Sequence, residues 1–326
     1  MTGPLPTIAR RKSRLGLYLM PGVLVLLSVA VSVWWGVATR LADAAFDHWL
    51  AKEAAAGRQW TCATRTMAGF PFRIELACDG LSLATSKGEP RALSLGGFVA
   101  VGQIYQPSLL LVDTRGPLQA TLANGQTITA QWTMMRSSLH FENPTRADRV
   151  AWVVDGLTTQ SNLPFATGHI GHAEFHMRSV PAESGPSQDH EIAVSVTEAG
   201  LHDGAIPASF EGHLTVNKGA VLLDTAGPDG LEAWRSAGGE LGIDQWEAKR
   251  GDQFLAVTGA LSLDENHRLT GTLDLAAKGI GDGLKEAGLG AFGGIIGSGA
   301  VKLPLTFNKG RLLLGPLKLA ELPPLY

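Results

Sequence analysis

The chain has 326 residues, of which 45% are hydrophobic and only 17% are charged, and its formal net charge is −3. The hydrophobic content excludes a mainly disordered chain, and the slightly acidic balance argues against a nucleic-acid binder, which usually presents a basic surface. The 40 glycines follow no three-residue period, so a collagen-like rod is excluded as well.

The amino-terminal region predicts a membrane anchor. No charged residue occurs from Leu15 to Thr39, and a helix of these 25 residues would be about 37 Å long, more than the roughly 30 Å of a hydrocarbon core. Four basic residues lie within residues 1–14, and such positive flanks stay in the cytoplasm. We therefore expect a cytoplasmic basic tail at 1–14, a transmembrane signal anchor at 15–39, a helical stalk at 40–57 and an exported remainder at 58–326.

Two alternatives to an uncleaved anchor remain. Ala42-Asp43-Ala44 resembles a signal-peptide cleavage site, although the apolar run exceeds the core of about 7–15 residues that signal peptides have. A buried helix of a soluble protein is the second alternative.

The chain contains two cysteines, Cys62 and Cys78. Because both follow the anchor, an oxidising compartment would allow a disulfide bond between them. Two free buried thiols, or a redox-active or metal-binding pair, are the alternatives. Between the cysteines, alternating residues from Phe72 to Ala77 predict a strand.

Alternating apolar and polar residues predict antiparallel strands through the rest of the exported part. The clearest runs are Ile192–Thr197, Leu255–Leu263, Leu269–Leu275 and Val301–Phe307. The fold class is therefore mainly β: one continuous, curved antiparallel sheet that forms a barrel, a sandwich or an open groove, preceded by one transmembrane helix.

A similar six-residue segment occurs twice, at Leu214–Gly219 and Leu305–Gly310. Each copy predicts a strand and an Asn-Lys-Gly turn, followed by a second strand at Val221–Leu223 or Leu312–Leu314. A short helix is expected at Asp229–Ala237. The glycine-rich composition of residues 279–299 predicts a loop or capping helix. Residues 181–190, with glycine, proline, serine and charges, are expected to form a surface loop.

A histidine-rich segment contains His169, His172, Glu174 and His176. Its alternating pattern predicts a strand, on which His172 and His176 would be about 13 Å apart and unable to share one metal ion. The sequence also lacks Gly-x-Ser-x-Gly and His-Glu-x-x-His. We therefore expect no metal site, no cofactor, no catalytic residues and no enzymatic activity.

Several blocks resemble a known family. Trp60-Thr61-Cys62, residues 69–75, residues 78–81 and the carboxy-terminal residues 307–316 are similar to an uncharacterised, mainly alphaproteobacterial envelope family that carries domain of unknown function 2125 (DUF2125). The chain also has a looser, fold-level similarity to AsmA-like β-rich envelope proteins. The resemblance implies a single-pass protein of the bacterial inner membrane with its C-terminal domain in the periplasm, and it implies no activity.

Many apolar strand faces and little helix to cover them suggest an apolar groove beside the membrane. The expected function is the binding or passage of an apolar envelope molecule such as a lipid, with no protein partner identified. A structural scaffold with a packed core is the alternative, and an exported hydrolase is the third hypothesis. The predicted groove lining consists of Leu255, Val257, Leu261, Leu273, Leu303 and Leu305.

Overall fold

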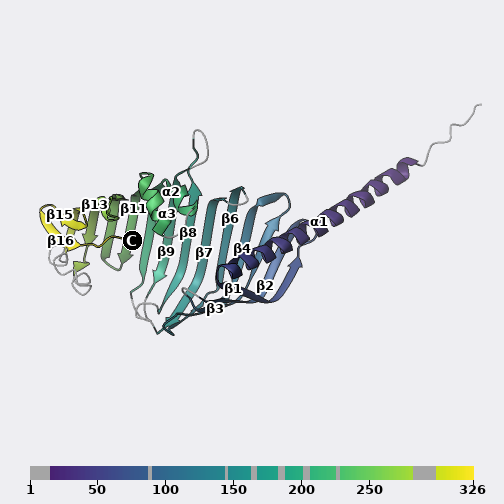
Figure 1. The fold of residues 1–326 in the computed structure, drawn as a ribbon, viewed down its shortest axis with the longest axis horizontal. Coiled ribbons are helices and arrows are strands. Elements are labelled where there is room, and N and C mark those ends of the chain that lie inside the picture. The colour runs from purple at the N-terminus through teal and green to yellow at the C-terminus, as the bar shows by residue number, and fades with distance from the viewer. Residues whose placement is uncertain are drawn as a thin grey trace, which may run out of the picture.

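The computed structural model describes residues 15–86, 90–143, 146–162, 167–182, 188–200, 206–224, 228–281 and 299–326. Within these residues, 16 strands form one large antiparallel sheet, from which a long helix projects (Figure 1). The prediction of a mainly β fold with one amino-terminal apolar helix is confirmed.

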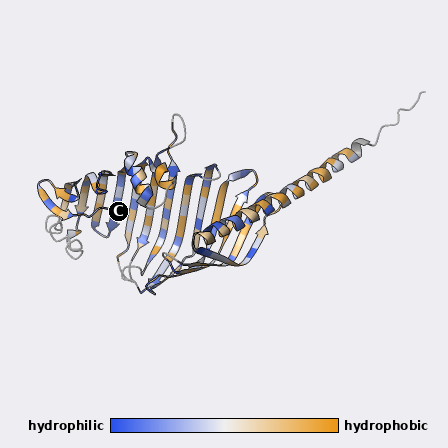
Figure 2. Ribbon diagram, viewed as in Figure 1, coloured by the Kyte–Doolittle hydropathy of each residue, from blue (hydrophilic) through white to orange (hydrophobic). Residues whose placement is uncertain are grey.

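Helix α1 (Leu15–Ala55) joins the predicted anchor and stalk in one continuous element. Among the described residues it is the one helix long and apolar enough to cross a membrane. Its side chains are exposed from Tyr18 to Trp34, and Trp35 is the first that the rest of the protein partly covers. Figure 2 shows the projecting part as mainly hydrophobic. An apolar surface of this extent requires an apolar partner or medium.

The strands follow one another along the sheet as a meander. The first eight are β1 (Arg58–Ala68), β2 (Arg73–Thr85), β3 (Ala92–Gln103), β4 (Gln106–Thr121), β5 (Thr127–Gln131), β6 (Met134–Asn143), β7 (Arg146–Ser161) and β8 (Gly168–Ser179). The remaining eight are β9 (His190–Ala199), β10 (Ala208–Asn217), β11 (Glu240–Arg250), β12 (Gln253–Leu263), β13 (Leu269–Lys278), β14 (Ala300–Asn308), β15 (Arg311–Leu314) and β16 (Leu317–Glu321).

The sheet is open. Each strand pairs with the next, except that β5 and β6 lie end to end between β4 and β7 and pair with different parts of both. In the described part of the chain, β1 pairs with β2 alone and β16 with β15 alone. The accessible surface of the chain is 20592 Å², whereas a compact monomer of 34.4 kDa exposes only about 12,900 Å². This excess is what a single-layer sheet with a projecting helix produces.

Two short helices lie between β10 and β11: α2 (Gly219–Asp224) and α3 (Pro228–Ser236). The buried indole of Trp234 in α3 donates a hydrogen bond of 2.7 Å to the Asn217 carbonyl at the end of β10. The carboxy-terminal Tyr326 donates to Glu232 of α3 and stacks on His267, with ring centroids 4.3 Å apart. These contacts hold α3 and the chain end at the ends of strands β10, β12 and β13.

The structure corrects one local prediction and confirms others. Val221–Leu223 was expected as a strand but belongs to helix α2, because β9 and β11 already occupy both edges of β10 and leave no edge for another strand. The corresponding strand in the second copy, Leu312–Leu314, is present as part of β15. The helix predicted at Asp229–Ala237 is confirmed as α3.

Two predicted loops lie partly outside the described residues. Residues 282–298 of the glycine-rich segment and residues 183–187 of the other loop belong to that part of the chain. His190, expected at the end of the second loop, instead begins β9 and is 2% exposed.

Candidate functional site

The two faces of the sheet differ in chemistry. On β8, Phe175 lies on one face, and its neighbours His176 and Glu174 lie on the other, because side chains alternate along a strand. We call the side that carries Phe175 the apolar face and the side that carries His176 the polar face. Helix α1 lies on the apolar face, where Phe46 contacts Phe98 with ring centroids 6.4 Å apart.

The apolar face carries a row of directly paired residues that runs across 13 strands. From β14 to β1, the row consists of Leu303, Leu275, Val257, Trp246, Gly212, Val194, Phe175, Trp152, Ser137, Val112, Ala100, Leu76 and Met67. Ser137 is its one hydroxyl-bearing member. Twelve steps of about 4.8 Å give a length of about 58 Å along the sheet. We call this set the apolar row.

The neighbouring row on the polar face is chemically different. In the same direction it consists of Lys302, Ala276, Ala256, Glu247, Glu211, Ser195, Glu174, Val153, Arg136, Asp113, Val99, Ala77 and Thr66. Six of these residues are charged. Charged residues therefore occur in the polar row and not in the apolar row, although five members of the polar row are alanine or valine. The striped strands in Figure 2 reflect the alternation between the two faces.

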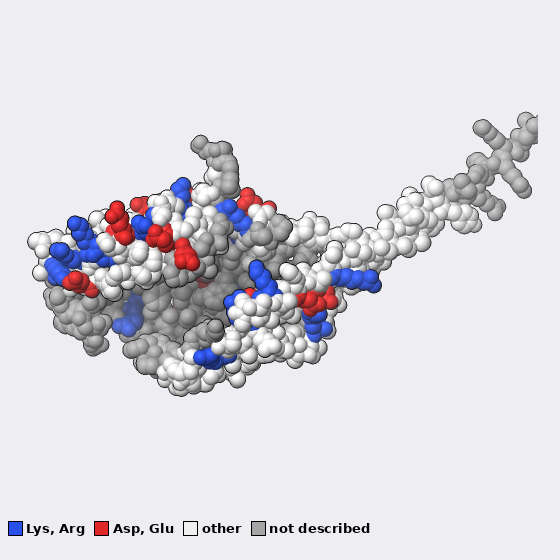
Figure 3. Space-filling view, viewed as in Figure 1, with Lys and Arg blue, Asp and Glu red and all other residues white. Residues whose placement is uncertain are grey.

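The C-terminal end of the apolar row is packed, whereas the members from β12 to β1 are mostly half-buried, and α1 lies against the same face near the N-terminal end. At the C-terminal end, Leu275 and Leu305 form a buried cluster with Ala277. At the N-terminal end, Trp49 of α1 packs on Trp60 of β1 with centroids 5.8 Å apart. Between these ends, most side chains of the row keep intermediate exposure. In Figure 3 this side of the molecule is hollowed between the N-terminal strands and the upper rim.

The six residues predicted to line a groove lie together on the apolar face of β12, β13 and β14. Leu305 belongs to the buried cluster, and Leu255, Val257, Leu273 and Leu303 are partly buried against it. Leu261 pairs with Leu241 and Gly271 and keeps intermediate exposure. Their role as a lining stays a prediction.

The predicted disulfide bond is present between Cys62 of β1 and Cys78 of β2. Cys78 is fully buried, and its strand neighbour in the register is Phe98, which contacts α1. Arg65 of β1 also forms ion pairs with Asp43 and Asp47 of α1, at 3.2 and 2.6 Å. The disulfide therefore stabilises the hairpin on which α1 rests.

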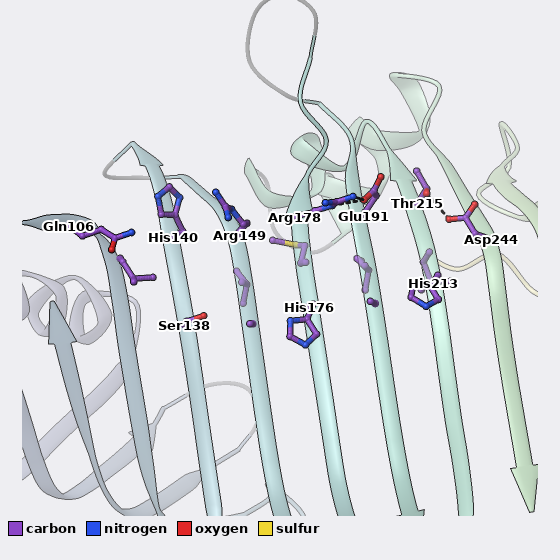
Figure 4. A pocket seen from close by; sticks show the side chains of 17 residues that line it. Gln106, Ser138, His140, Arg149, His176, Arg178, Glu191, His213, Thr215 and Asp244 are labelled. Atoms are coloured by element: carbon purple, nitrogen blue, oxygen red, sulfur yellow. Dashed lines mark hydrogen bonds and ion pairs between the residues drawn. The ribbon is translucent and has the colours of Figure 1, made fainter. Parts of the chain in front are cut away.

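The polar face contains a cavity of about 690 Å³ across β4 and β6–β11. Figure 4 views it from the side opposite to Figure 1, because the strands run in the reverse order from left to right. His140, His176 and His213 line it, together with charged residues of both signs. Arg178 pairs with Glu191, and Thr215 donates to Asp244, so much of its polar lining is internally satisfied.

At one edge of this cavity three side chains form a hydrogen-bonded chain. The Ser108 hydroxyl lies 3.2 Å from Nε2 of His140, and Nδ1 of the same ring lies 2.5 Å from the Asp148 carboxylate. A serine, a base and a carboxylate in this order form the arrangement that activates a serine nucleophile. The three residues come from β4, β6 and β7, so no local motif marks them, and sequence reasoning missed them.

The histidine-rich segment forms a second polar chain on β7 and β8. Asp155 contacts His172 at 2.5 Å, His172 contacts Glu174 at 2.9 Å, and Glu174 contacts His176 at 3.0 Å. Hydrogen bonds to Asp155 and then Glu174 raise the pKa of His172, whereas those from His176 and His172 lower the pKa of Glu174. His169 lies apart, bridged to Gly200. The described residues contain no group of three or more histidine, cysteine or carboxylate side chains that could hold a metal ion.

Comparison with known proteins identifies a family. A model of uncharacterised bacterial proteins, DUF2125, matches residues 35–323. The chain belongs to the DUF2125 family. No curated protein and no solved structure matches it.

The match to DUF2125 begins at Trp35, where α1 first contacts the sheet. The family segment therefore comprises the second half of α1 together with the whole sheet. The two elements form one packed unit, and no activity accompanies the family description.

Proposed function

We propose that this DUF2125 protein is a non-catalytic module that binds or passes an apolar envelope molecule, such as a lipid, along the apolar face of its sheet. The single observation that carries this proposal is the apolar row. It is continuous over about 58 Å and has a charged counterpart on the opposite face. Packing within the chain does not account for the whole row, because most of its middle members stay half-buried.

The length of the row favours passage over a single closed pocket. One leaflet of a bilayer contributes about 15 Å of the roughly 30 Å hydrocarbon core. An acyl chain of that length would occupy only a part of the row, so the row offers it several successive positions. Each methylene group transferred from water to such a surface contributes about 0.8 kcal/mol. Several methylene groups together can therefore hold an acyl chain on the row, and movement by one position exposes only a few of them to water at a time.

The proposal places α1 across the bacterial inner membrane with the sheet in the periplasm. The basic residues before Leu15 support a cytoplasmic amino terminus. The Cys62–Cys78 disulfide bond supports an oxidising compartment for the sheet.

Site-specific photo-crosslinking tests the proposal with a matched pair of positions. A photoreactive phenylalanine analogue at Phe175 would face the apolar row, and the same analogue at His176 would face the polar side of the same strand. After irradiation in cells, we expect lipid adducts on the protein at position 175 and none at 176. No adduct at 175, or equal adducts at both positions, would contradict lipid binding and would favour a scaffold for envelope proteins.

A second candidate function is ester hydrolysis, and the Ser108–His140–Asp148 chain favours it. In this reaction the Ser108 oxygen would attack the carbonyl carbon of a carboxylic ester while Nε2 of His140 takes the hydroxyl proton. That proton would pass to the leaving alcohol, and water would then hydrolyse the acyl-serine ester to a carboxylic acid. Asp148 would hold the ring through Nδ1.

A fluorophosphonate probe, which modifies activated serines, tests this candidate on the purified full chain. If the chain is a hydrolase, the probe should label Ser108, and Ser108→Ala and His140→Ala should abolish the labelling. Ser138, which lines the neighbouring cavity, supplies the control, because Ser138→Ala should leave the labelling unchanged. Absence of labelling in the wild type would assign the three side chains a structural role only.

A further inference from the structure

Three aromatic side chains project from adjacent turns at one end of the first strands. Phe70 and Phe72 lie in the β1–β2 turn and are 57% and 67% exposed, and Tyr105 in the β3–β4 turn is 74% exposed. The two turns are bonded to each other, because the Ile104 amide donates to the Phe72 carbonyl at 3.1 Å. We call these three residues the aromatic rim. Large aromatic rings this exposed, and gathered together, mark an interaction surface.

The backbone holds the rim in place. Gly69 opens the β1–β2 turn with a φ of +100°, which glycine adopts without strain, and a side chain there would meet the Arg73 carbonyl oxygen. The Arg73 amide closes the turn by donating to the Gly69 carbonyl at 3.1 Å. The exposed rings are therefore presented by a tight, bonded turn.

The length of helix α1 determines the depth at which the aromatic rim lies relative to a bilayer. The 20 residues from Leu15 to Trp34 span about 30 Å, which is the thickness of a hydrocarbon core. The next residue, Trp35, donates its indole N–H to the Arg73 carbonyl at 3.0 Å, and its ring meets Phe70 edge-on with centroids 5.5 Å apart. In Figure 3 the described part of the projecting helix carries no charged atoms until it reaches the sheet. The turn thus touches α1 where the hydrocarbon would end.

We propose that the aromatic rim docks into the interfacial layer of the same bilayer that α1 crosses. Tyrosine and tryptophan favour this layer, where an apolar ring body and a polar tip are both accommodated. The charges beside the rim are paired, since Arg73 contacts Glu75 at 2.5 Å. The rim therefore recognises the apolar boundary between headgroups and acyl chains and does not require anionic headgroups.

Docking would bring the apolar row to the membrane surface. Met67 and Leu76, the last members of the row, lie two residues before Gly69 and four residues after Phe72. A lipid leaving the outer leaflet beside the rim would reach the row without crossing water. This inference rests on the proposed membrane anchoring and lipid binding, and it specifies where the lipid would enter.

Spin-label accessibility in the full chain, reconstituted in phosphatidylcholine vesicles, tests the inference. A nitroxide is attached to Phe72→Cys, and, in separate variants, to Leu26→Cys and Leu325→Cys. Leu26 in α1 is 70% exposed, and Leu325, near the chain end away from α1 in Figure 1, is 55% exposed. Collisions with oxygen report lipid, and collisions with a water-soluble nickel complex report water. The native disulfide leaves no competing thiol among the described residues.

We expect the label at position 72 to collide several-fold more with oxygen, relative to nickel, than the label at position 325, and less than the label at position 26. If position 26 reports lipid while position 72 matches position 325, the docking inference is wrong and the anchor stands. If position 26 reports water, the anchoring itself fails. If both reagents are excluded at position 72, a protein contact covers the rim, which also overturns the inference.

Discussion

Reduction of the Cys62–Cys78 disulfide bond should weaken the part of the sheet that carries α1. The two cysteines are 16 residues apart, and opening a loop of this size costs about 3 kcal/mol in the chain-entropy model. The loss would concentrate in the β1–β2 hairpin, because Trp60 and Arg65 of that hairpin contact α1 through Trp49 and through Asp43 and Asp47. Loosening it would therefore also loosen α1.

Urea unfolding of the purified chain in detergent, followed by tryptophan fluorescence, measures this effect. The comparison is between the oxidised wild type and the same protein reduced with dithiothreitol, which differ in one covalent bond and no side chain. We expect a free energy of unfolding about 3 kcal/mol lower after reduction. Identical midpoints would refute the reasoning, and so would two freely reactive thiols in freshly isolated protein.

Three further changes have distinct expected outcomes. Phe98→Ala should lower the free energy of unfolding by about 2–3 kcal/mol in the same urea assay, because the half-buried Phe98 ring packs on α1. The variant should also make α1 more sensitive to proteolysis. An unchanged urea midpoint would contradict this packing. Gly271→Ala should cost at least about 2 kcal/mol, since Gly271 has a φ of +136° and a Cβ there would overlap the Ala260 carbonyl, whereas Gly102→Ala, with open space around it, should stay within about 0.5 kcal/mol. His172→Gln should weaken the pH dependence of the melting temperature. Because the pKa of His172 is raised in the fold, its protonation stabilises the fold below about pH 6.5, and this stabilisation is lost as the pH rises through the folded pKa. The melting temperature of the wild type should therefore exceed that of the variant most near about pH 6, and the two should converge at higher pH. A constant difference over that range would argue against a charged His172.

The sequence predicts the strands well because their periodicity is strong and continuous. Leu255–Leu263 alternates without interruption, and the structure contains it as β12. The helix also follows directly from an uncharged run. The strand predicted at Val221–Leu223 is wrong because a short apolar run is compatible with either a strand or a helix. The pairing of β10 with β11 excludes the strand.

The candidate sites were harder to predict than the fold. The groove lining inferred from β12–β14 captures only the C-terminal part of the apolar row, because the register that joins Phe175 to Trp152 and Val194 is a long-range property. Ser108 and His140 are 32 residues apart and meet only through the pairing of β4 with β6. The disulfide was predictable because the chain has only two cysteines, which lie close in sequence and both follow the predicted anchor.

The apolar face is accessible only if the sheet stays open. Spin labels on Thr61→Cys in β1 and Lys318→Cys in β16, both exposed, test it in vesicles with the full chain. The structure leaves these two strands at opposite ends of the sheet, so we expect sharp single-label spectra and a long distance by pulsed dipolar spectroscopy. A closed barrel would bring the strands to about 4.8 Å from each other, and the strong dipolar broadening that follows would contradict the account.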